Sequence, residues 1–543
     1  MKKWQKRWMS CWQENKFLVK PYLVVFLIYL VGASALLLAG VHYADDIART
    51  NYGYAGWNGF SRYLSTLLAY GLHADGYLAN IAPLPQLLAV AILALASVMM
   101  IGVVVGKEIF KGPVKKWIWS VIAVVPLGLS PYMLECLAYQ YDSVYMAIAV
   151  LFAVWPLMFR SGSRWVYGFA IAVGVLAICM TYQAAIGILP MLVVMVAVRD
   201  WNEKRQEGGE VAKVGCNKTT VSDDGIKGKA VRKWVNLKFV AFSAVVFLVT
   251  LVFFQKVLMK PRDAYASNSL PEIQDLIPKF FEHLGQYFNL VWQDFKIWWL
   301  VLIGVVCVGF VVMLVMRSRK KKIVAGIVGL VSLVMIFVLA FAIYAVLDKP
   351  LFATRAMFPL GVAIAIVGVY AVTGAAGASK NGADCKSERL VWLWRVPVMV
   401  IAWCFVIFAL TFGNALKEQE NYRNEMADMV ISDLNEMSVM KDGVTKYIQV
   451  KGNMGFSPVI LHMPSDDTIL QRLLMPTYSE YVPWMAYRVT RQSGFNNLVF
   501  DEEVDLSEKD LPVLKDTVFY RISGNKEGIL VEFKSEQRFN VIF

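Results

Sequence analysis

The chain has 543 residues, of which 58% are hydrophobic and only 17% are charged. Soluble globular proteins average roughly 45–50% apolar residues, so this composition excludes an ordinary soluble protein and indicates a membrane protein. Residues 1–414 contain 40 Lys and Arg against 21 Asp and Glu, whereas residues 415–543 contain 14 against 20. Because the net charge of +13 belongs to the apolar part of the chain, it indicates membrane topology rather than a nucleic-acid partner.

Eleven apolar runs are long enough, or nearly so, to cross about 30 Å of hydrocarbon as helices. They lie near 21–41, 83–105, 118–132, 143–159, 165–180, 183–198, 239–258, 297–316, 323–346, 357–374 and 396–414. The third to sixth runs are short and closely joined, so one hairpin among them can be re-entrant. The basic N-terminus precedes the first run without a small-residue cleavage site, which indicates a signal anchor. The predicted fold is a polytopic α-helical bundle over residues 1–414.

The orientation follows from the distribution of Lys and Arg. If the N-terminus is cytoplasmic, the cytoplasmic segments hold 31 of the 40 basic residues in the apolar part of the chain, and the opposite side holds nine. Since the number of predicted spans is odd, residues 415–543 are expected outside the cytoplasm. We therefore expect a multi-pass protein embedded in membrane lipid, with no nucleic-acid partner.

Residues 415–543 are predicted to form a small soluble α+β domain. Apolar side chains at helical spacing predict an amphipathic helix over 415–440 that rises out of the membrane. Short apolar runs between turn residues predict strands at 447–450, 459–461, 518–522, 528–533 and 539–542. None of the seven cysteines falls in this region, so no disulfide framework is expected.

Two adjacent carboxylates, Asp45 and Asp46, follow the first apolar run. Adjacent acids at a membrane boundary repel one another and are costly to desolvate, so one of them can have a raised pKa and act as a general base. The alternative is a pair of solvated loop charges. The loop continues with aromatic residues and glycines to Arg62 and then reaches Asp75. This composition suits an interfacial helix lining a sugar-sized cleft, or plain interfacial anchors.

Polar residues recur at the predicted outer ends of later spans. If their segment is helical, Glu135, Tyr139 and Asp142 share one face at i, i+4 and i+7 spacing. Ionisable residues at membrane depth face a cavity or a partner more often than lipid. Tyr182 and Gln183 lie at an outer hairpin, which is either a simple turn or a sugar contact.

Lys260, Arg262 and Arg355 are cations on a side that is otherwise poor in them. A guanidinium beside the bilayer can grip a phosphate through paired hydrogen bonds; the alternative is snorkelling to lipid headgroups. The four histidines lack metal-ligand spacing, and no glycine-rich phosphate loop ends in Lys-Ser or Lys-Thr. No cofactor is predicted, although a divalent cation stays open, and ATP-driven chemistry is not expected.

The order and spacing of these residues over about 20–200 resemble the phage-type O-antigen glucosyltransferases, the Gtr serotype-converting enzymes of the GT-C class of integral-membrane glycosyltransferases. The resemblance rests on Asp45–Arg49, Gly56-Trp57 with Arg62, Pro83–Leu88, Ser130–Asp142 and Tyr182-Gln183. It departs from the family pattern at Ser61, where a glycine is expected before the arginine.

The resemblance implies a GT-C-like bundle in the bacterial cytoplasmic (inner) membrane. Such an enzyme moves glucose, or a related hexose, from a polyprenyl-phosphate donor to an O-antigen or another lipid-linked cell-surface glycan outside the cytoplasm. It also implies that Asp45 or Asp46 takes the proton of the attacking hydroxyl, and we favour Asp46. Substrate binding is assigned to Arg62, Asp75, Glu135, Tyr139, Asp142, Tyr182, Gln183, Lys260, Arg262 and Arg355.

Two other classes compete with this interpretation. A transporter or flippase of lipid-linked sugar would bury its acids in mid-span and would have pseudo-symmetric halves. In this sequence the acids gather at one predicted rim, and no repeat is detectable. A binding or assembly protein would act through residues 415–543.

Overall fold

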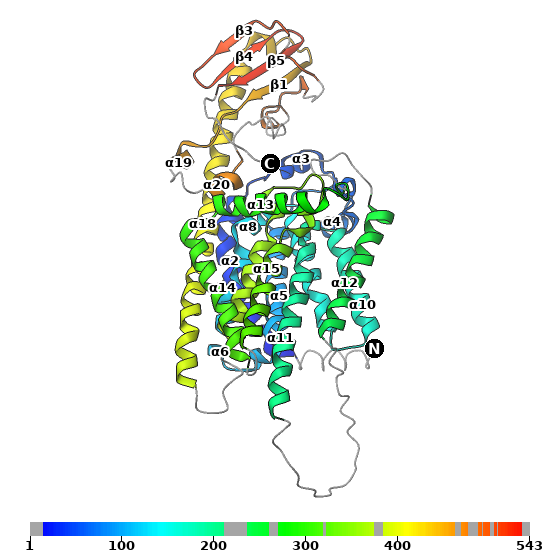
Figure 1. Cartoon of the computed structure of the whole chain (residues 1–543). Helices are drawn as coiled ribbons and strands as arrows, with labels where there is room; N and C mark the ends of the chain where they lie inside the picture. Colours follow the sequence, from blue (N-terminus) through cyan, green and yellow to red (C-terminus); the bar gives the residue numbers. More distant parts are fainter. Residues whose placement is uncertain are drawn as a thin grey trace, which may run out of the picture.

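The computed structural model describes residues 15–210, 236–259, 270–318, 322–373, 384–461, 468–475, 487–490, 492–499, 504–507 and 509–534. A helical bundle makes up most of it, and a small sheet stands beyond one end of the bundle (Figure 1). This end is called the sheet end below. The arrangement confirms the predicted polytopic α-helical fold with a C-terminal sheet region.

Seven helices within the described residues are long and apolar enough to cross a membrane. They are Lys16–Ala39, Leu84–Val105, Gln183–Asn202, Leu237–Leu258, Ile297–Arg317, Lys322–Leu339 and Val391–Glu436. One bent pair, Val114–Leu129 with Pro131–Ala138, counts as an eighth span, and three shorter apolar helices cover Ser143–Phe159, Arg164–Cys179 and Pro359–Thr373. All eleven predicted runs are therefore helical, but only seven are unbroken helices of spanning length.

The bent pair owes its break to Pro131. A proline disfavours helical backbone in the residue before it, and Ser130 accordingly adopts φ −62° and ψ 149°. The chain bends by 56° there and continues as α8 (Pro131–Ala138). After the bend, α8 lies among the elements at the sheet end (Figure 1). Its residue Glu135 contacts Thr354 and Arg355 of the later chain.

The bundle is built around α17 (Pro359–Thr373), in which every residue is buried. A helix surrounded by protein on all sides needs no lipid-matching length, which fits its 15 residues. The other bundle helices are α2 (Val19–Ala39), α5 (Leu84–Val105), α6 (Val114–Ala123), α7 (Val125–Leu129), α9 (Ser143–Val154), α10 (Arg164–Cys179), α11 (Ile188–Glu210), α12 (Asn236–Phe253), α14 (Ile297–Arg317) and α15 (Lys322–Leu339).

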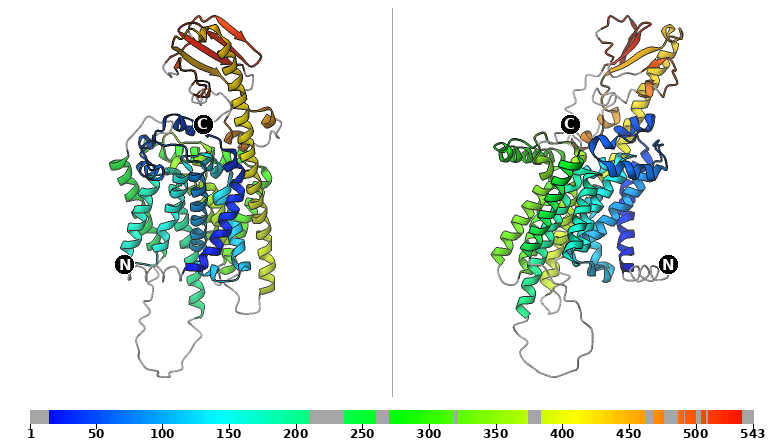
Figure 2. Two further views of the ribbon diagram at one scale, coloured as in Figure 1. Left: turned by 180° about the vertical axis from the view of Figure 1, so that it is seen from behind. Right: turned by 90° about the vertical axis from the view of Figure 1, so that its right-hand side faces the viewer.

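Short helices cap the bundle at the sheet end. They are α3 (Asp45–Tyr52), η2 (Trp57–Phe60), α4 (Tyr63–His73), η5 (Gln183–Gly187), α13 (Leu276–Asp294), α16 (Ala342–Ala345) and η7 (Thr354–Ala356). α13 lies crosswise to the bundle helices (Figure 1 and the right-hand view of Figure 2). These caps and the end of α8 supply most of the described polar residues that the sequence singled out.

A single long helix, α18 (Asp384–Glu436), joins the bundle to the sheet. It packs along α2 in the bundle, and its last turns bury Met426, Val430 and Leu434 against the sheet. The helix predicted over 415–440 is therefore the continuation of the last span.

The sheet has the strand order β2-β1-β5-β4-β3. β1 (Lys446–Gly452) is parallel to β2 (Leu498–Val499) and to β5 (Gly528–Phe533), whereas β4 (Tyr520–Gly524) is antiparallel to β5 and to β3 (Val513–Asp516). Three short helices, α19 (Pro458–Leu461), α20 (Thr468–Leu473) and α21 (Tyr487–Thr490), lie between β1 and β2 in the sequence.

The predicted strands at 447–450 and 528–533 are confirmed, and the one at 518–522 is displaced to Tyr520–Gly524. The strand predicted at 459–461 is wrong, because these residues form α19. Pro458 suits the first position of a helix, and the preceding Ser457 N–H donates to Gln419 of α18 instead of to a sheet partner. The run at 539–542 lies outside the described residues.

Candidate active site

The Asp45-Asp46 pair opens α3. Two carboxylates in the first turn favour a helix, because they face the positive end of its dipole. The helix ends at Gly53, which has φ 64° and donates its N–H to the Arg49 carbonyl at 2.7 Å. Arg49 thus projects one turn after the acids, within reach of Asp45.

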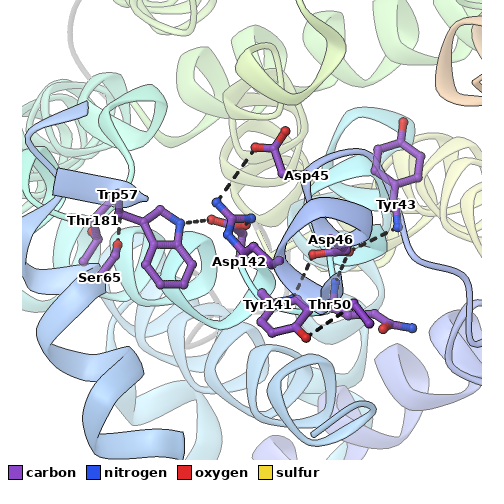
Figure 3. Close-up of polar contacts among 11 residues, drawn as sticks. Tyr43, Asp45, Asp46, Thr50, Trp57, Ser65, Tyr141, Asp142 and Thr181 are labelled. Carbon is purple, nitrogen blue, oxygen red and sulfur yellow. Dashed lines mark hydrogen bonds and ion pairs between the residues drawn. The ribbon is translucent and has the colours of Figure 1, made fainter. Parts of the chain in front are cut away.

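Asp46 is completely buried. Its carboxylate accepts backbone N–H bonds from Gln140 at 2.7 Å, from Tyr43 at 3.2 Å and from Tyr141 at 3.3 Å (Figure 3). Burial and the negative charge of Asp142 raise the pKa of Asp46 well above its ordinary value, although the backbone bonds oppose the shift. The expected raised pKa is therefore present, but this carboxylate fastens α3 to the turn that follows α8.

Asp45 points away from Asp46 (Figure 3) and is half exposed. One of its oxygens lies 3.9 Å from Arg49, whose guanidinium is buried and also binds Asp142. Asp142 receives a further hydrogen bond from the Trp57 indole, and the Arg49 guanidinium lies 4.6 Å from the centre of that ring. Since Asp142 is fully engaged, the accessible carboxylate of this cluster is Asp45.

A second ionic group surrounds Glu135. Its carboxylate accepts a hydrogen bond from the Thr354 hydroxyl and lies 3.3 Å from Arg355 Nη1. The Glu135 side chain is buried, whereas 24% of the Arg355 side chain is exposed. A buried carboxylate thus holds the guanidinium of a partly exposed arginine, an arrangement that can present a cation to an anionic substrate.

Arg62 lies next to this group. Its Nε donates to Gln183 Oε1 at 3.0 Å, and its guanidinium lies 4.9 Å from the centre of the Tyr182 ring. The Tyr182 hydroxyl in turn donates to the Arg355 carbonyl at 3.0 Å. Ser61, where the family pattern has a glycine, adopts φ 59°, the left-handed region that glycine favours.

Tyr139 connects the two groups. Its ring contacts the Tyr43 ring edge-on, with the centroids 5.0 Å apart. Burial raises the pKa of the Tyr139 phenol well above its ordinary value, and the charges of Arg355, Glu135 and Asp45 all act on it. The charges of the half-exposed Asp45 and of the partly exposed Arg355 therefore both reach one buried tyrosine.

Residues of α20, in the C-terminal region, contact the chain segments that carry the site. Arg472 of α20 forms an ion pair with Asp294 at the end of α13 and donates to the Phe352 carbonyl at 3.1 Å. The next carbonyl, that of Leu473, accepts the Tyr43 hydroxyl at 2.7 Å. One short helix therefore contacts both the chain before the Asp45-Asp46 pair and the chain before Arg355.

Comparison with known proteins identifies the family. The model of the glucosyl transferase GtrII family matches residues 34–372, which is more than half of the chain. The chain belongs to the GtrII glucosyl transferase family. An uncharacterized 55.3 kDa protein of Salmonella phage P22, from the region 5′ of gtrB, is 26% identical over 141 residues. The alignment spans 26% of this chain and 27% of that protein. No solved structure matches the chain.

All site residues from Asp45 to Arg355 lie inside the segment that matches the GtrII model. The helix α20 lies outside that segment. The structure brings nine of the predicted site residues into or beside the two ionic groups. They are Asp45, Asp46, Arg62, Glu135, Tyr139, Asp142, Tyr182, Gln183 and Arg355. Asp75 is exposed and accepts N–H bonds from Gly76 and Tyr77 in a local turn. Lys260 and Arg262 lie outside the described residues.

Four site residues were not assigned from the sequence: Arg49, Trp57, Thr354 and Arg472. Arg49 and Trp57 carried a signal, since both stand in the stretch that resembles the family, but their pairing with Asp142 depends on the tertiary structure. Arg472 lies in the C-terminal region, where no site residue was predicted. Among the described residues, no three His, Cys, Asp or Glu side chains are grouped to hold a metal ion.

Proposed function

We propose that this GtrII-family protein transfers glucose, or a related hexose, from a polyprenyl-phosphate donor to an O-antigen or another cell-surface glycan. The transfer takes place on the outer side of the bacterial cytoplasmic membrane. The observation that carries the proposal is a half-exposed carboxylate, Asp45, and a partly exposed guanidinium, Arg355, whose charges both act on the buried Tyr139. A proton acceptor and a phosphate-binding cation are the two groups that this reaction needs.

In the proposed mechanism, Asp45 is the general base. An acceptor hydroxyl attacks the anomeric carbon of the donor and passes its proton to the Asp45 carboxylate, and the bond from that carbon to the phosphate oxygen breaks. Direct displacement inverts the anomeric centre. Asp46 is not the base in this scheme, because its buried carboxylate is occupied by backbone N–H groups. Arg49, whose guanidinium lies 3.9 Å from an Asp45 oxygen, orients this carboxylate.

The leaving polyprenyl phosphate gains negative charge as the bond breaks. In the proposal Arg355 binds this phosphate, since a planar guanidinium can donate two parallel hydrogen bonds to it. Glu135 and Thr354 fix the position of Arg355 before substrate arrives. Arg62, stacked on Tyr182, supplies a second positive charge beside the same segment.

The proposed orientation places the sheet end outside the cytoplasm. The distribution of Lys and Arg supports this orientation. Of the 40 basic residues in residues 1–414, 31 lie in the segments predicted to be cytoplasmic, which alternate along the chain with the loops that carry the site. Outside the cytoplasm nucleotide sugars are absent, so a lipid-linked donor suits a site at the membrane boundary.

The test uses full-length protein in lipid nanodiscs with polyprenyl-phosphate glucose and the O-antigen polysaccharide of the encoding strain. The product should gain the mass of one hexose. Asp45→Asn preserves the shape of the side chain but removes the proton acceptor, so turnover should fall roughly 10²–10⁴-fold while donor binding survives. Asp428→Asn is the matched control, because Asp428 is also an exposed carboxylate paired with an arginine, Arg488. Near-normal turnover of folded Asp45→Asn protein would remove Asp45 from this role.

A further inference from the structure

Three exposed tyrosines lie at the C-terminal end of α3 or pack against the glycines that follow it. Tyr52 is 38% exposed, Tyr54 is 44% exposed and Tyr77 is 55% exposed. Burial of its remaining area raises the pKa of the Tyr54 phenol, and the charges of Arg49 and Asp45 and the phenol of Tyr52 all act on it. Tyr54 therefore lies within range of the charges of Asp45 and Arg49, yet the proposed chemistry does not use the three rings.

The backbone is shaped to hold two of these rings. Gly53 has φ 64°, and a Cβ atom there would lie 2.1 Å from Cε2 of Tyr77. Gly56 has φ 72°, and a Cβ atom there would lie 2.7 Å from Cε2 of Tyr54. Each ring thus lies directly on a glycine, and any larger residue would displace it. The Leu78 N–H donates to the Gly53 carbonyl at 2.9 Å, and this bond holds the loop that contains Tyr77 against the end of α3.

Tyr52 and its neighbour Asn51 contact the C-terminal region. The Tyr52 ring contacts the Tyr487 ring of α21 edge-on, with centroids 5.4 Å apart, and α3 lies between the bundle and the sheet (Figure 1). Asn51 of α3 also accepts a hydrogen bond from Gln492 at 3.4 Å. An anchor in the lipid interface would point outward along the rim of the bundle, so these contacts argue against that role.

We propose that Tyr52, Tyr54 and Tyr77 form the binding surface for the acceptor glycan. The C–H faces of sugar rings are apolar and pack on aromatic rings, while their hydroxyls bond to neighbouring amides and carboxylates. Here the exposed rings offer the apolar surface, Asn51 and Gln492 offer amides, and Asp45 opens the same helix, α3, that carries Asn51 and Tyr52. The inference rests on the proposed function and adds the location of its acceptor.

The experiment measures initial rates in nanodiscs with polyprenyl-phosphate glucose and the O-antigen polysaccharide of the encoding strain. Tyr54→Ala and Tyr77→Ala should each raise the KM for the polysaccharide roughly tenfold, because each removes a central aromatic contact. The kcat and the donor KM should change little. Tyr54→Phe and Tyr77→Phe keep the ring and should retain the wild-type KM. Tyr447→Ala is the matched control, because Tyr447 is a similarly exposed tyrosine on β1.

Saturation-transfer NMR of the same polysaccharide, recorded without donor, separates this inference from the proposed function. Binding that is lost in the two Ala variants supports the surface even if the wild-type protein transfers no sugar. Wild-type transfer with an unchanged acceptor KM in both Ala variants would overturn the surface and leave the proposed function standing. A rise in the donor KM alone would also overturn it.

Discussion

The ion pair between Arg472 and Asp294 allows a sharp test of how the C-terminal region is held on the bundle. Asp294 is completely buried, and only 15% of the Arg472 side chain is exposed. One Asp294 oxygen also accepts the Tyr132 hydroxyl at 2.6 Å, whereas its other oxygen has no hydrogen-bond partner among the described residues. Arg472→Met removes the countercharge and keeps much of the side-chain volume.

The expected cost is large. Removing one partner of a buried ion pair typically destabilises a protein by about 3–5 kcal/mol, because the other charge stays buried without compensation. The Phe352 carbonyl also loses its hydrogen bond from Arg472, which costs about 1 kcal/mol of stability. The remaining Tyr132 bond offsets part of this loss. We therefore expect a destabilisation of about 3 kcal/mol, near the lower end of the range for buried pairs.

The measurement is thermal unfolding of the detergent-solubilised protein at several pH values, followed by tryptophan fluorescence. Burial raises the pKa of Asp294, and Arg472 opposes this shift. Without Arg472 the folded-state pKa rises further above the unfolded value of about 3.9, so the folded state binds the proton more tightly. The variant should thus be closest to wild type at low pH and should lose stability as the pH rises above about 4.

Two further variants decide the outcome. Arg472→Met combined with Asp294→Asn should recover most of the lost stability and should abolish the added pH dependence, because no buried charge remains. Arg488→Met removes an exposed ion pair with Asp428 and should cost at most about 1 kcal/mol. Two results would contradict an uncompensated buried charge at Asp294: a loss of stability in Arg472→Met no greater than that in Arg488→Met, or a double variant no more stable than Arg472→Met.

Four other predictions follow from the site. Arg355→Lys keeps the charge but loses the planar fork, so kcat/KM for the donor should fall roughly tenfold. The kcat/KM of Arg355→Ala should be lower still. Wild-type kcat/KM values in both variants would assign Arg355 to lipid headgroups. Asp46→Asn turns an amide NH2 toward backbone N–H donors and should lower stability by about 1–3 kcal/mol, read as a lower unfolding temperature. Ser61→Gly should keep activity because φ 59° suits glycine, whereas Ser61→Val should lose it. A reporter enzyme active only outside the cytoplasm should work when fused after Phe543, and cytoplasmic activity would reverse the proposed orientation.

The contacts of α20 have a consequence for the proposed mechanism. Through Arg472 and Leu473 this helix contacts both Phe352, three residues before Arg355, and Tyr43, two residues before Asp45. The distance between the proposed base and the proposed phosphate-binding cation therefore depends on a segment outside the part that matches the family model.

The sequence by itself determined the positions of the membrane helices. Each of the eleven apolar runs forms a helix, because a long apolar segment in lipid must satisfy its backbone groups internally. The sequence also located most of the residues that meet at the sheet end, because polar side chains between apolar runs gather where the spans end. It predicted two of the sheet strands closely but misassigned 459–461, since so short an apolar run carries no distinctive period.

Only the tertiary structure decided the roles within the site. Asp45 and Asp46 are neighbours of the same type, and the sequence cannot show that one carboxylate is buried against the backbone of residues 140 and 141 while the other is half exposed. The pairings of Arg49 with Asp142 and of Arg472 with Asp294 join residues 93 and 178 positions apart. Such contacts depend on how whole helices pack, and packing is set by the combined shape of many side chains, which no local pattern encodes.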